Sequence, residues 1–236
     1  MKRIIIENDF WSLFKDAKIG VVVCNNIDNY IKDEKKYESM LLEAQKQAMN
    51  YLTEEDFSNN KVIKVWRDAF KKFKTKKGAR CSIEAMLKRV SNGNNIGNIN
   101  PLVDIYNSVS LKYGLPCGGE DIDTFDGDIR LTRANGEEEF ITFGSDENIP
   151  PYEGEVVYKD NKGAICRCLN WRESTRTMLT EKTQNALLCI ELIDESRVNE
   201  FEEALKFLAD TITENLGGKS KVAILDNSNR EMIIQV

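Results

Sequence analysis

The chain contains 236 residues, of which 41% are hydrophobic and 31% charged, and its net charge is −6. This composition is typical of a soluble globular protein, and no apolar run is long enough for a membrane span or a signal peptide. The sequence lacks histidine, which excludes Ser-His-Asp and Cys-His catalysis and imidazole metal sites. Its six cysteines show no CxxC spacing, and we therefore expect a cytoplasmic protein in a reducing compartment.

The first ninety residues combine short apolar strands with amphipathic helices. Residues 4–6 and 19–23 have the β-branched composition of buried strands. Helices are expected over residues 33–52, 61–74 and 82–90, because apolar side chains recur there at intervals of three and four. This part of the sequence therefore predicts a mixture of strands and helices without an internal repeat.

Residues 61–89 form a basic strip, with eleven Lys or Arg residues against two acids. The strip has a net charge of +9, which leaves −15 for the rest of the chain. Such an asymmetry indicates a face that contacts nucleic-acid phosphates, although a solvated helix face gives the same pattern. The candidate phosphate contacts are Lys64, Lys71, Lys72, Lys74, Lys76, Lys77 and Arg80.

The helix with the clearest ends follows a loop rich in glycine and asparagine. Asn100 is suited to cap it, Pro101 fits the first helical position, and Gly114 supplies a left-handed stop. Asn107 lies in the interior of this helix, where asparagine has a weak helical preference. Its amide is therefore a candidate functional group, and the alternative is an amide bonded to solvent or to its own helix.

A segment rich in glycine and acids follows at residues 115–128. Gly118 and Gly119 let the backbone approach a ligand, and Glu120 and Asp121 begin the acidic run. The run does not fit a calcium-binding loop, because its sixth and twelfth positions are not glycine and glutamate. We interpret the segment as a turn beside a candidate pocket, and a solvated acidic turn is the alternative.

The C-terminal half is richer in strands. The dipeptide Asn135-Gly136 predicts a tight hairpin between residues 129–133 and 139–143. Further strands are expected over residues 156–158, 164–168 and 186–193, a helix over residues 195–216, and a closing hairpin of residues 222–225 and 232–236. The irregular alternation of helices and strands predicts the α+β class and a single domain over residues 1–236.

Common catalytic and cofactor motifs are missing from the sequence. It contains no Walker loop, dinucleotide fingerprint, zinc-ligand spacing or GxSxG elbow. We therefore expect neither a bound metal nor a cofactor, and catalysis would use carboxylates, oriented water, backbone N–H groups or the substrate itself. The residues alone indicate an α+β domain with a basic strip and an acidic candidate pocket.

Several ordered motifs resemble the B3/B4 editing domain of bacterial phenylalanyl-tRNA synthetase β subunits. Residues 101–121 resemble that family's helix and turn, with Asn107, Gly114 and Pro116 at matching places, and TQNALL at residues 183–188 resembles a second stretch. The segments SIEAMLKR, NPLVDIYN, GEVVY and NWRES occur in the same order in freestanding members. The resemblance covers about residues 75–195 and implies a single B3/B4-like domain with a mixed or antiparallel sheet flanked by helices.

Domains of this family hydrolyse the ester of a wrong amino acid on tRNA. The resemblance therefore implies a trans-editing aminoacyl-tRNA deacylase, a hydrolase whose partner is mischarged tRNA. The ester is already activated and a vicinal ribose hydroxyl can position water, so the protein supplies a fitted pocket and backbone donors to the oxyanion. This chemistry suits a chain without histidine. Editing is needed because one site separates near-isosteric side chains only about a hundredfold.

The family's motifs also imply which residues form the site. The motif asparagine corresponds to Asn107, the pocket histidine to Gly118, and the glutamate that reads the side chain to Cys189, with Glu191 on the same strand face. A glycine-rich segment of the family corresponds to residues 168–173. The implied catalytic residues are Asn107, Glu173 and Glu191, and the implied substrate-binding residues are Tyr106, Gly118, Gly119, Glu120, Asp121, Asn170, Trp171, Arg172 and Cys189.

These departures from the family pattern favour a substrate other than tyrosine. Additional acids and the space at Gly118 suit a long cationic or hydrogen-bond-donating side chain, because a buried carboxylate needs a partner. Among freestanding relatives this implies an arginine-like amino acid such as canavanine on the arginine tRNA. If Arg172 neutralises Glu173, a neutral side chain is the alternative. For the whole chain, a non-catalytic tRNA- or RNA-binding module, a small-molecule binder and an unrelated hydrolase remain alternatives.

Overall fold

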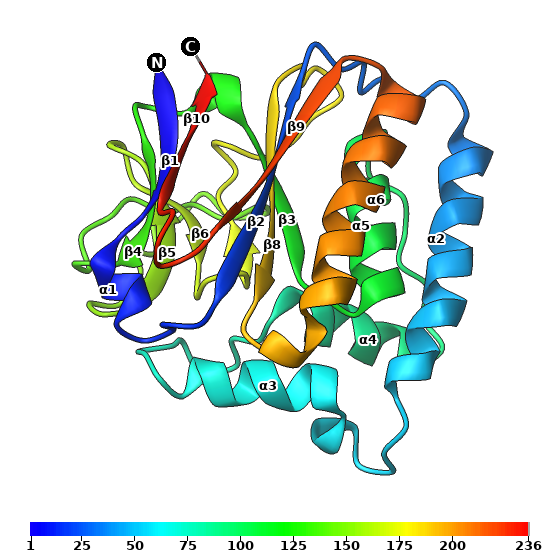
Figure 1. Ribbon diagram of the computed structural model, residues 1–236, viewed down its shortest axis with the longest axis horizontal. Helices are drawn as coiled ribbons and strands as arrows, with labels where there is room; N and C mark the ends of the chain where they lie inside the picture. Colours follow the sequence, from blue (N-terminus) through cyan, green and yellow to red (C-terminus); the bar gives the residue numbers. More distant parts are fainter. Residues whose placement is uncertain (236) are drawn as a thin grey trace.

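Two β-sheets pack face to face, and helices cover the outer face of the smaller sheet (Figure 1). The computed structural model describes residues 1–235. One sheet has six strands in the order β10 (Glu231–Gln235), β1 (Lys2–Ile6), β4 (Ile129–Arg133), β5 (Val156–Lys159), β6 (Ala164–Arg167) and β7 (Arg172–Glu173). The other has four, in the order β3 (Cys117–Asp121), β8 (Ala186–Leu192), β2 (Lys18–Asn25) and β9 (Lys219–Leu225).

The helices lie in two groups. The outer layer consists of α2 (Glu34–Ala48), α5 (Pro101–Tyr113) and α6 (Val198–Leu216); α5 and α6 pack on the four-stranded sheet and α2 packs on α5. The other group is α1 (Asn8–Trp11), beside β4, with α3 (Lys61–Phe70) and α4 (Ser82–Ser91) across the lower end of the sheets in Figure 1. Within residues 1–235, no helix has the length and apolar character that crossing a bilayer requires. The chain is therefore an α+β protein, as the sequence predicts.

The side-chain alternation of β2 shows how the layers are held together. Val21 and Val23 enter the core between the two sheets, whereas Val22 and Cys24 enter the core beneath the helices. Both faces of the strand are buried, which explains its continuous apolar sequence. Because successive strand residues point to opposite faces, every second residue of this sheet is directed into the space between the sheets.

The ends of the central helix α5 are as predicted. The Asn100 side chain accepts a hydrogen bond from the Val103 N–H at 3.2 Å, and Pro101 is the first helical residue. Gly114 ends the helix in the left-handed region with φ of 58°, a conformation that glycine adopts without a steric penalty. Helix α4 begins at Ser82 as predicted, and Cys81 rather than Ser82 is its N-cap residue.

The predicted hairpin at Asn135-Gly136 is wrong. Strand β4 pairs antiparallel with β5, and residues 139–143 make only isolated bridges to residues 163 and 174 in the part of the chain that the structure describes. The carboxylate of Glu138 accepts hydrogen bonds from the Asn135 and Gly136 N–H groups at 3.0 and 3.1 Å. The Glu138 side chain therefore holds this loop, and no ladder of hydrogen bonds joins the strands on either side of it. The association of Asn-Gly with tight hairpins takes no account of such side-chain bonds.

The predicted closing hairpin is also wrong, although both strands exist. Strand β9 pairs with β2 in the four-stranded sheet, and β10 pairs with β1 in the six-stranded sheet. The turn at Asp226–Asn229 therefore carries the chain from one sheet to the other, and the chain ends lie side by side (Figure 1). Residue 236, included in the predicted second strand, lies outside the described residues.

The acidic segment after α5 is a strand and not a turn. Residues Cys117–Asp121 form β3, which pairs antiparallel with β8 so that Gly118 lies opposite Cys189 and Glu120 opposite Leu187. Directly opposed residues share a face of the sheet, and this face is the one directed between the two sheets. The correction matters for function, because a strand directs alternate side chains to one side, whereas a turn would leave them in solvent.

Gly20 in β2 allows α6 to approach the sheet, and an alanine there is expected to destabilise the fold. A Cβ at this position would lie 2.5 Å from Leu205 Cδ2 in a buried core. We expect Gly20→Ala to lower the free energy of unfolding by about 1–3 kcal/mol, the usual cost of overpacking, in urea titrations. Gly97→Ala is the matched control, because its Cβ would meet nothing within 4 Å. Equal stability of both variants would contradict the tight contact.

Candidate functional site

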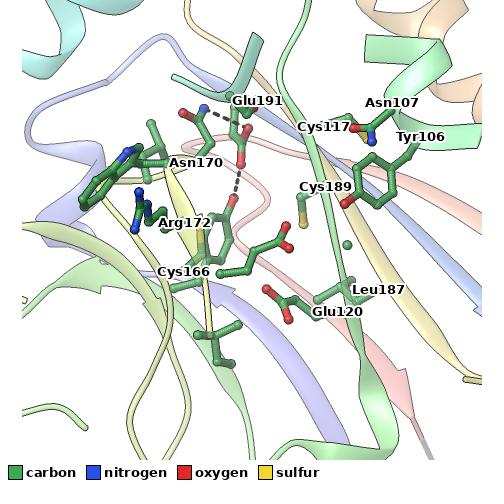
Figure 2. A pocket seen from close by; sticks show the side chains of 18 of the residues that line it. Tyr106, Asn107, Cys117, Glu120, Cys166, Asn170, Arg172, Leu187, Cys189 and Glu191 are labelled. Carbon is green, nitrogen blue, oxygen red and sulfur yellow. Dashed lines mark hydrogen bonds between the residues drawn. The ribbon is translucent and has the colours of Figure 1, made fainter. Parts of the chain in front are cut away.

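A cavity of about 330 Å³ lies between the two sheets (Figure 2). Residues of β3 and β8 line it from the four-stranded sheet, and residues of β5, β6 and β7 line it from the six-stranded sheet. Helices α4 and α5 and the loop before Trp171 complete the wall. The volume lies within the range of small-molecule binding sites, and the cavity is therefore the candidate functional site.

Three glutamates from three strands line this cavity. Glu120 lies on β3, Glu173 on β7 and Glu191 on β8. On β8, Leu187, Cys189 and Glu191 are two residues apart and all line the cavity, as strand alternation requires. The fold thus gathers acids that are distant in the sequence into one apolar space, where carboxylates are costly to ionise.

Glu191 is held in place by two hydrogen bonds (Figure 2). Its Oε1 accepts from the Tyr158 hydroxyl at 2.8 Å, and its Oε2 accepts from Asn170 Nδ2 at 3.2 Å. Burial raises the pKa of Glu191 to about 7, while the bonds from Tyr158 and Asn170 oppose that rise. Glu191 is therefore a preorganised group that changes charge close to neutral pH.

Glu173 is positioned by the absence of a side chain at residue 118. A Cβ on Gly118 would lie 3.1 Å from Glu173 Oε1, closer than most Cβ contacts in proteins. Burial raises the pKa of the Glu173 carboxyl to about 7, and a hydrogen bond from the Gly119 backbone opposes the rise. Gly118 thus leaves space that the Glu173 carboxyl group occupies.

Glu120 is the least satisfied of the three acids. Its Oε2 is buried and has no hydrogen-bond partner within residues 1–235. Burial raises its pKa well above the usual range and the nearby Glu173 carboxylate raises it further, whereas the Thr177 hydroxyl and the Arg176 guanidinium oppose the rise. A buried, unpartnered carboxyl oxygen costs free energy, so the site gains stability when a donor or a cation reaches Glu120.

Two other buried polar atoms of the cavity lining also lack a partner in the described part of the chain. These atoms are the Ser82 Oγ at the start of α4 and the Oδ1 of Asn170, the residue whose Nδ2 bonds Glu191. Buried polar groups in native proteins are nearly always hydrogen-bonded. Together with Glu120 Oε2, they define a set of positions that a ligand with several N–H donors can satisfy.

Helix α5 contributes Tyr106 and Asn107 on the other side of the cavity (Figure 2). Burial raises the pKa of Tyr106 well above its usual range, and Glu173 raises it further. Asn107 is half-buried, and its amide has no hydrogen bond to residues 1–235. The helix-interior asparagine singled out in the sequence is therefore directed to the cavity and is free to bond a ligand.

The structure brings together all but one of the predicted catalytic and substrate-binding residues. The cavity lining includes Tyr106, Asn107, Gly118, Gly119, Glu120, Asn170, Trp171, Arg172, Glu173, Cys189 and Glu191. Asp121 does not line the cavity, because it alternates with Glu120 and its Oδ2 accepts a hydrogen bond from Thr183 Oγ1 at 2.7 Å. The prediction that Asp121 binds substrate is therefore withdrawn.

Arg172 and Glu173 do not neutralise each other. Both residues line the cavity, but the two form no ion pair in the described part of the chain. The exposed Arg172 guanidinium lies 5.0 Å from the centre of the Trp171 ring instead. The cavity therefore keeps the Glu173 carboxyl group available to a ligand.

Sequence reasoning missed several lining residues. Tyr158 supplies the bond to Glu191, Ser82 supplies a free hydroxyl, and Cys117 and Cys166 add small apolar surface. Burial raises the pKa of both thiols well above the usual range, so they are not nucleophiles near neutral pH. Nothing in the local pattern distinguishes these residues from ordinary core positions.

The positions of the cysteine and acidic side chains bear on whether the chain holds a metal ion. Residues 1–235 contain no cluster of three or more cysteine, aspartate or glutamate side chains arranged to hold a metal ion. The three cavity glutamates line the cavity from three different strands.

The basic strip divides into a paired and an unpaired part. Lys64 and Lys71 both pair with Asp68, at 2.6 and 2.7 Å, and Arg67 pairs with Glu84 at 2.7 Å. Between α3 and α4, the residues of the strip that form no ion pair within residues 1–235 are Lys72, Lys74, Lys76, Lys77 and Arg80. This unpaired segment leads directly to Ser82 and so to the cavity wall.

Comparison with known proteins identifies the family. No curated protein matches the chain significantly. The fold is similar to an N-terminal fragment of the phenylalanyl-tRNA synthetase β-subunit from Pyrococcus horikoshii, with a TM-score of 0.48 and 12% identity over 95% of this chain and 54% of that chain. The chain thus spans about half the length of that fragment. A profile of the B3/4 domain family matches residues 65–214, more than half of the chain, and the chain therefore belongs to the B3/4 domain family.

Proposed function

We propose that the chain is a trans-acting aminoacyl-tRNA deacylase whose cavity takes a cationic, arginine-like side chain such as that of canavanine. The observation that carries the proposal is the set of three glutamates on one cavity. Every glutamate that forms an ion pair within residues 1–235 lies elsewhere, at residues 7, 43, 84, 138, 155, 200 and 231. The cavity acids are therefore available to a ligand that brings its own positive charge.

A guanidinium group matches this set of atoms. It presents five N–H donors and one positive charge, and an adjacent positive charge stabilises the ionised form of Glu173 and Glu191. Its donors can satisfy the Glu120 and Asn170 oxygens that lack partners in residues 1–235. A neutral aromatic side chain would leave these oxygens unpaired at a cost of about 1–3 kcal/mol each, which supports discrimination by charge.

The motifs shared with synthetase editing domains support an aminoacyl-tRNA ester as the reacting group. An ester needs an attacking water and stabilisation of the oxyanion that develops at its carbonyl oxygen. Burial sets the pKa of Glu173 and Glu191 to about 7, the range in which a carboxylate accepts a proton from water efficiently at neutral pH. The Asn107 amide on the opposite wall is the candidate oxyanion donor.

A non-catalytic RNA-binding module is the competing function. Such a module is favoured if a bulky side chain fills the cavity, and Trp171 is the residue that would do so. In the structure Trp171 lines the cavity and leaves about 330 Å³ open beside it. The open cavity therefore favours the deacylase over the binding module.

The experiment that separates the two functions measures ester hydrolysis directly. The protein is added to a panel of tRNAs that each carry a labelled non-cognate amino acid, and release of the label is followed at neutral pH. We expect catalytic turnover of at least one ester. Tight tRNA binding without release of any amino acid would contradict the deacylase and support the module.

The unpaired segment of the basic strip is expected to contact tRNA phosphates. Each lost phosphate contact reduces the slope of log affinity against log salt by about 1. Changing Lys76 and Lys77 to Gln is therefore expected to weaken binding of all tRNAs and to reduce the slope by about 2. Lys64→Gln with Lys71→Gln is the matched control, because both lysines already pair with the carboxylate of Asp68. Equal slopes in both double variants would show that the segment is only solvated surface.

A further inference from the structure

We propose that Trp171 and Arg172 form a nucleobase-stacking site at the mouth of the cavity. The inference rests on the proposed function, since an amino acid esterified to ribose places the terminal nucleoside of the RNA beside the pocket that holds its side chain. The indole of Trp171 lines the cavity and is half-buried, and Arg172 is exposed. The two side chains therefore lie where the cavity meets solvent.

The Trp171–Arg172 pair has the chemistry of a base platform. The Arg172 guanidinium lies 5.0 Å from the centre of the indole ring and makes no ion pair within residues 1–235. Unpaired bases are recognised by stacking on aromatic rings and on guanidinium planes. Stacking of this kind accepts any base, which suits a site that must take a common terminal nucleoside.

The backbone that carries Trp171 is strained. Cys168 and Leu169, two consecutive residues other than glycine, have positive φ values of 48° and 66°. Such a conformation is unfavourable for residues other than glycine and persists only where the surroundings enforce it. The strain directs Asn170 and Trp171 to the cavity, and we infer that their placement is what the strained loop maintains.

Buried contacts enforce the strained loop from both sides. Arg167 forms a fully buried pair with Glu155, with Nε–Oε1 and Nη2–Oε2 distances of 2.9 and 2.7 Å, and Glu155 Oε1 also accepts the Cys168 N–H at 3.0 Å. On the other side, the Asn170 carbonyl accepts the N–H of Ser82, the first residue of α4, at 3.1 Å. Buried contacts therefore fix the backbone of the loop that carries Trp171.

The charges around the platform suit an RNA end. The unpaired lysines and arginine of residues 74–80 precede Ser82, which contacts the same loop. Phosphates on the 5′ side of a stacked nucleoside would meet positive charge there, whereas the amino acid would enter the acidic cavity. The basic residues near the cavity mouth thus suit the phosphates, and the acidic residues inside the cavity suit a cationic amino-acid side chain.

Tryptophan fluorescence tests the platform without any ester. Trp11 and Trp66 are only 3% and 2% exposed, so quenching by a small nucleotide reports on Trp171. We expect AMP to quench the wild-type protein saturably and ribose 5-phosphate, which has no base, to leave it unchanged. In Trp171→Phe, the emission of the two remaining tryptophans should not respond to AMP. Equal responses of wild type and Trp171→Phe, or no response of either, would overturn the proposal.

Kinetics add a measurement that a purely structural role would not reproduce. For an ester that the wild type hydrolyses, Trp171→Ala is expected to raise KM at least fivefold with little change in kcat, and Trp171→Phe should recover most of the loss. Phe143→Ala is the matched control, since Phe143 is 78% exposed and lies outside the cavity lining. Unchanged KM in a folded Trp171→Ala variant would overturn the platform and leave the deacylase intact. Saturable AMP quenching without ester hydrolysis would contradict the deacylase and leave the stacking site intact.

Discussion

Replacing Glu120 by glutamine is expected to lower kcat/KM for release of an arginine-like amino acid by at least thirtyfold. This factor corresponds to about 2 kcal/mol of barrier, within the range for a hydrogen bond to a charged group in a buried site. Burial raises the pKa of Glu120 well above its usual range. A bound guanidinium favours the ionised form, and glutamine cannot supply that charge.

The measurement compares kcat/KM for canavanyl-tRNA in wild type, Glu120→Gln, Glu173→Gln and Glu191→Gln. Glu214→Gln on the exposed face of α6 is the control for the same chemical change outside the cavity. At least one cavity variant should lose selectivity for the cationic residue while retaining release of a neutral one. Full activity and selectivity in all three folded variants would rule out the glutamates as the side-chain site.

Replacing Asn107 by alanine is expected to slow deacylation at least tenfold, about 1.4 kcal/mol of barrier. Asn107 is half-buried on the cavity wall, and its amide makes no bond to residues 1–235. Loss of a single oxyanion donor lowers kcat more than it changes KM. We expect the fold to survive, since the Asn100 cap and Gly114 fix the ends of α5 independently of this residue.

The control for Asn107→Ala is a thermal melt, together with the KM of the variant. An unchanged melting temperature and KM with reduced kcat would assign Asn107 to the chemical step. Full activity in a folded variant would remove Asn107 from the site. A fall in melting temperature alone would give the amide a structural role and would equally contradict the assignment.

The sequence predicts those parts of the fold that depend on local chemistry. Asn100, Pro101 and Gly114 mark the ends of α5 correctly, because capping and left-handed conformations depend on single residues. The strands β2 and β8 are recognised from continuous apolar runs. Pairing between strands depends on contacts across the whole chain, and for this reason both predicted hairpins failed where β5 and β1 supplied other partners.

Only some residues of the candidate site can be predicted from the sequence. Asn107 is visible because asparagine is unusual inside a helix. Glu173 and Glu191 carry no local signal and are found only through the resemblance, and Tyr158 is not found at all. The position of Asp121 is misjudged because β3 was expected to be a turn, and the alternation of a strand turns Asp121 away from Glu120.

The most direct test of the account compares four esters with the wild-type protein at neutral pH. The esters are canavanyl-, arginyl-, citrullinyl- and tyrosyl-tRNA, where citrulline is the neutral analogue of arginine with nearly the same shape. We expect kcat/KM to be at least tenfold higher for canavanyl-tRNA than for tyrosyl-tRNA and for citrullinyl-tRNA, because the cavity acids form no ion pair within residues 1–235. Release of tyrosine or citrulline as fast as, or faster than, release of canavanine would contradict a cavity that selects a cationic side chain.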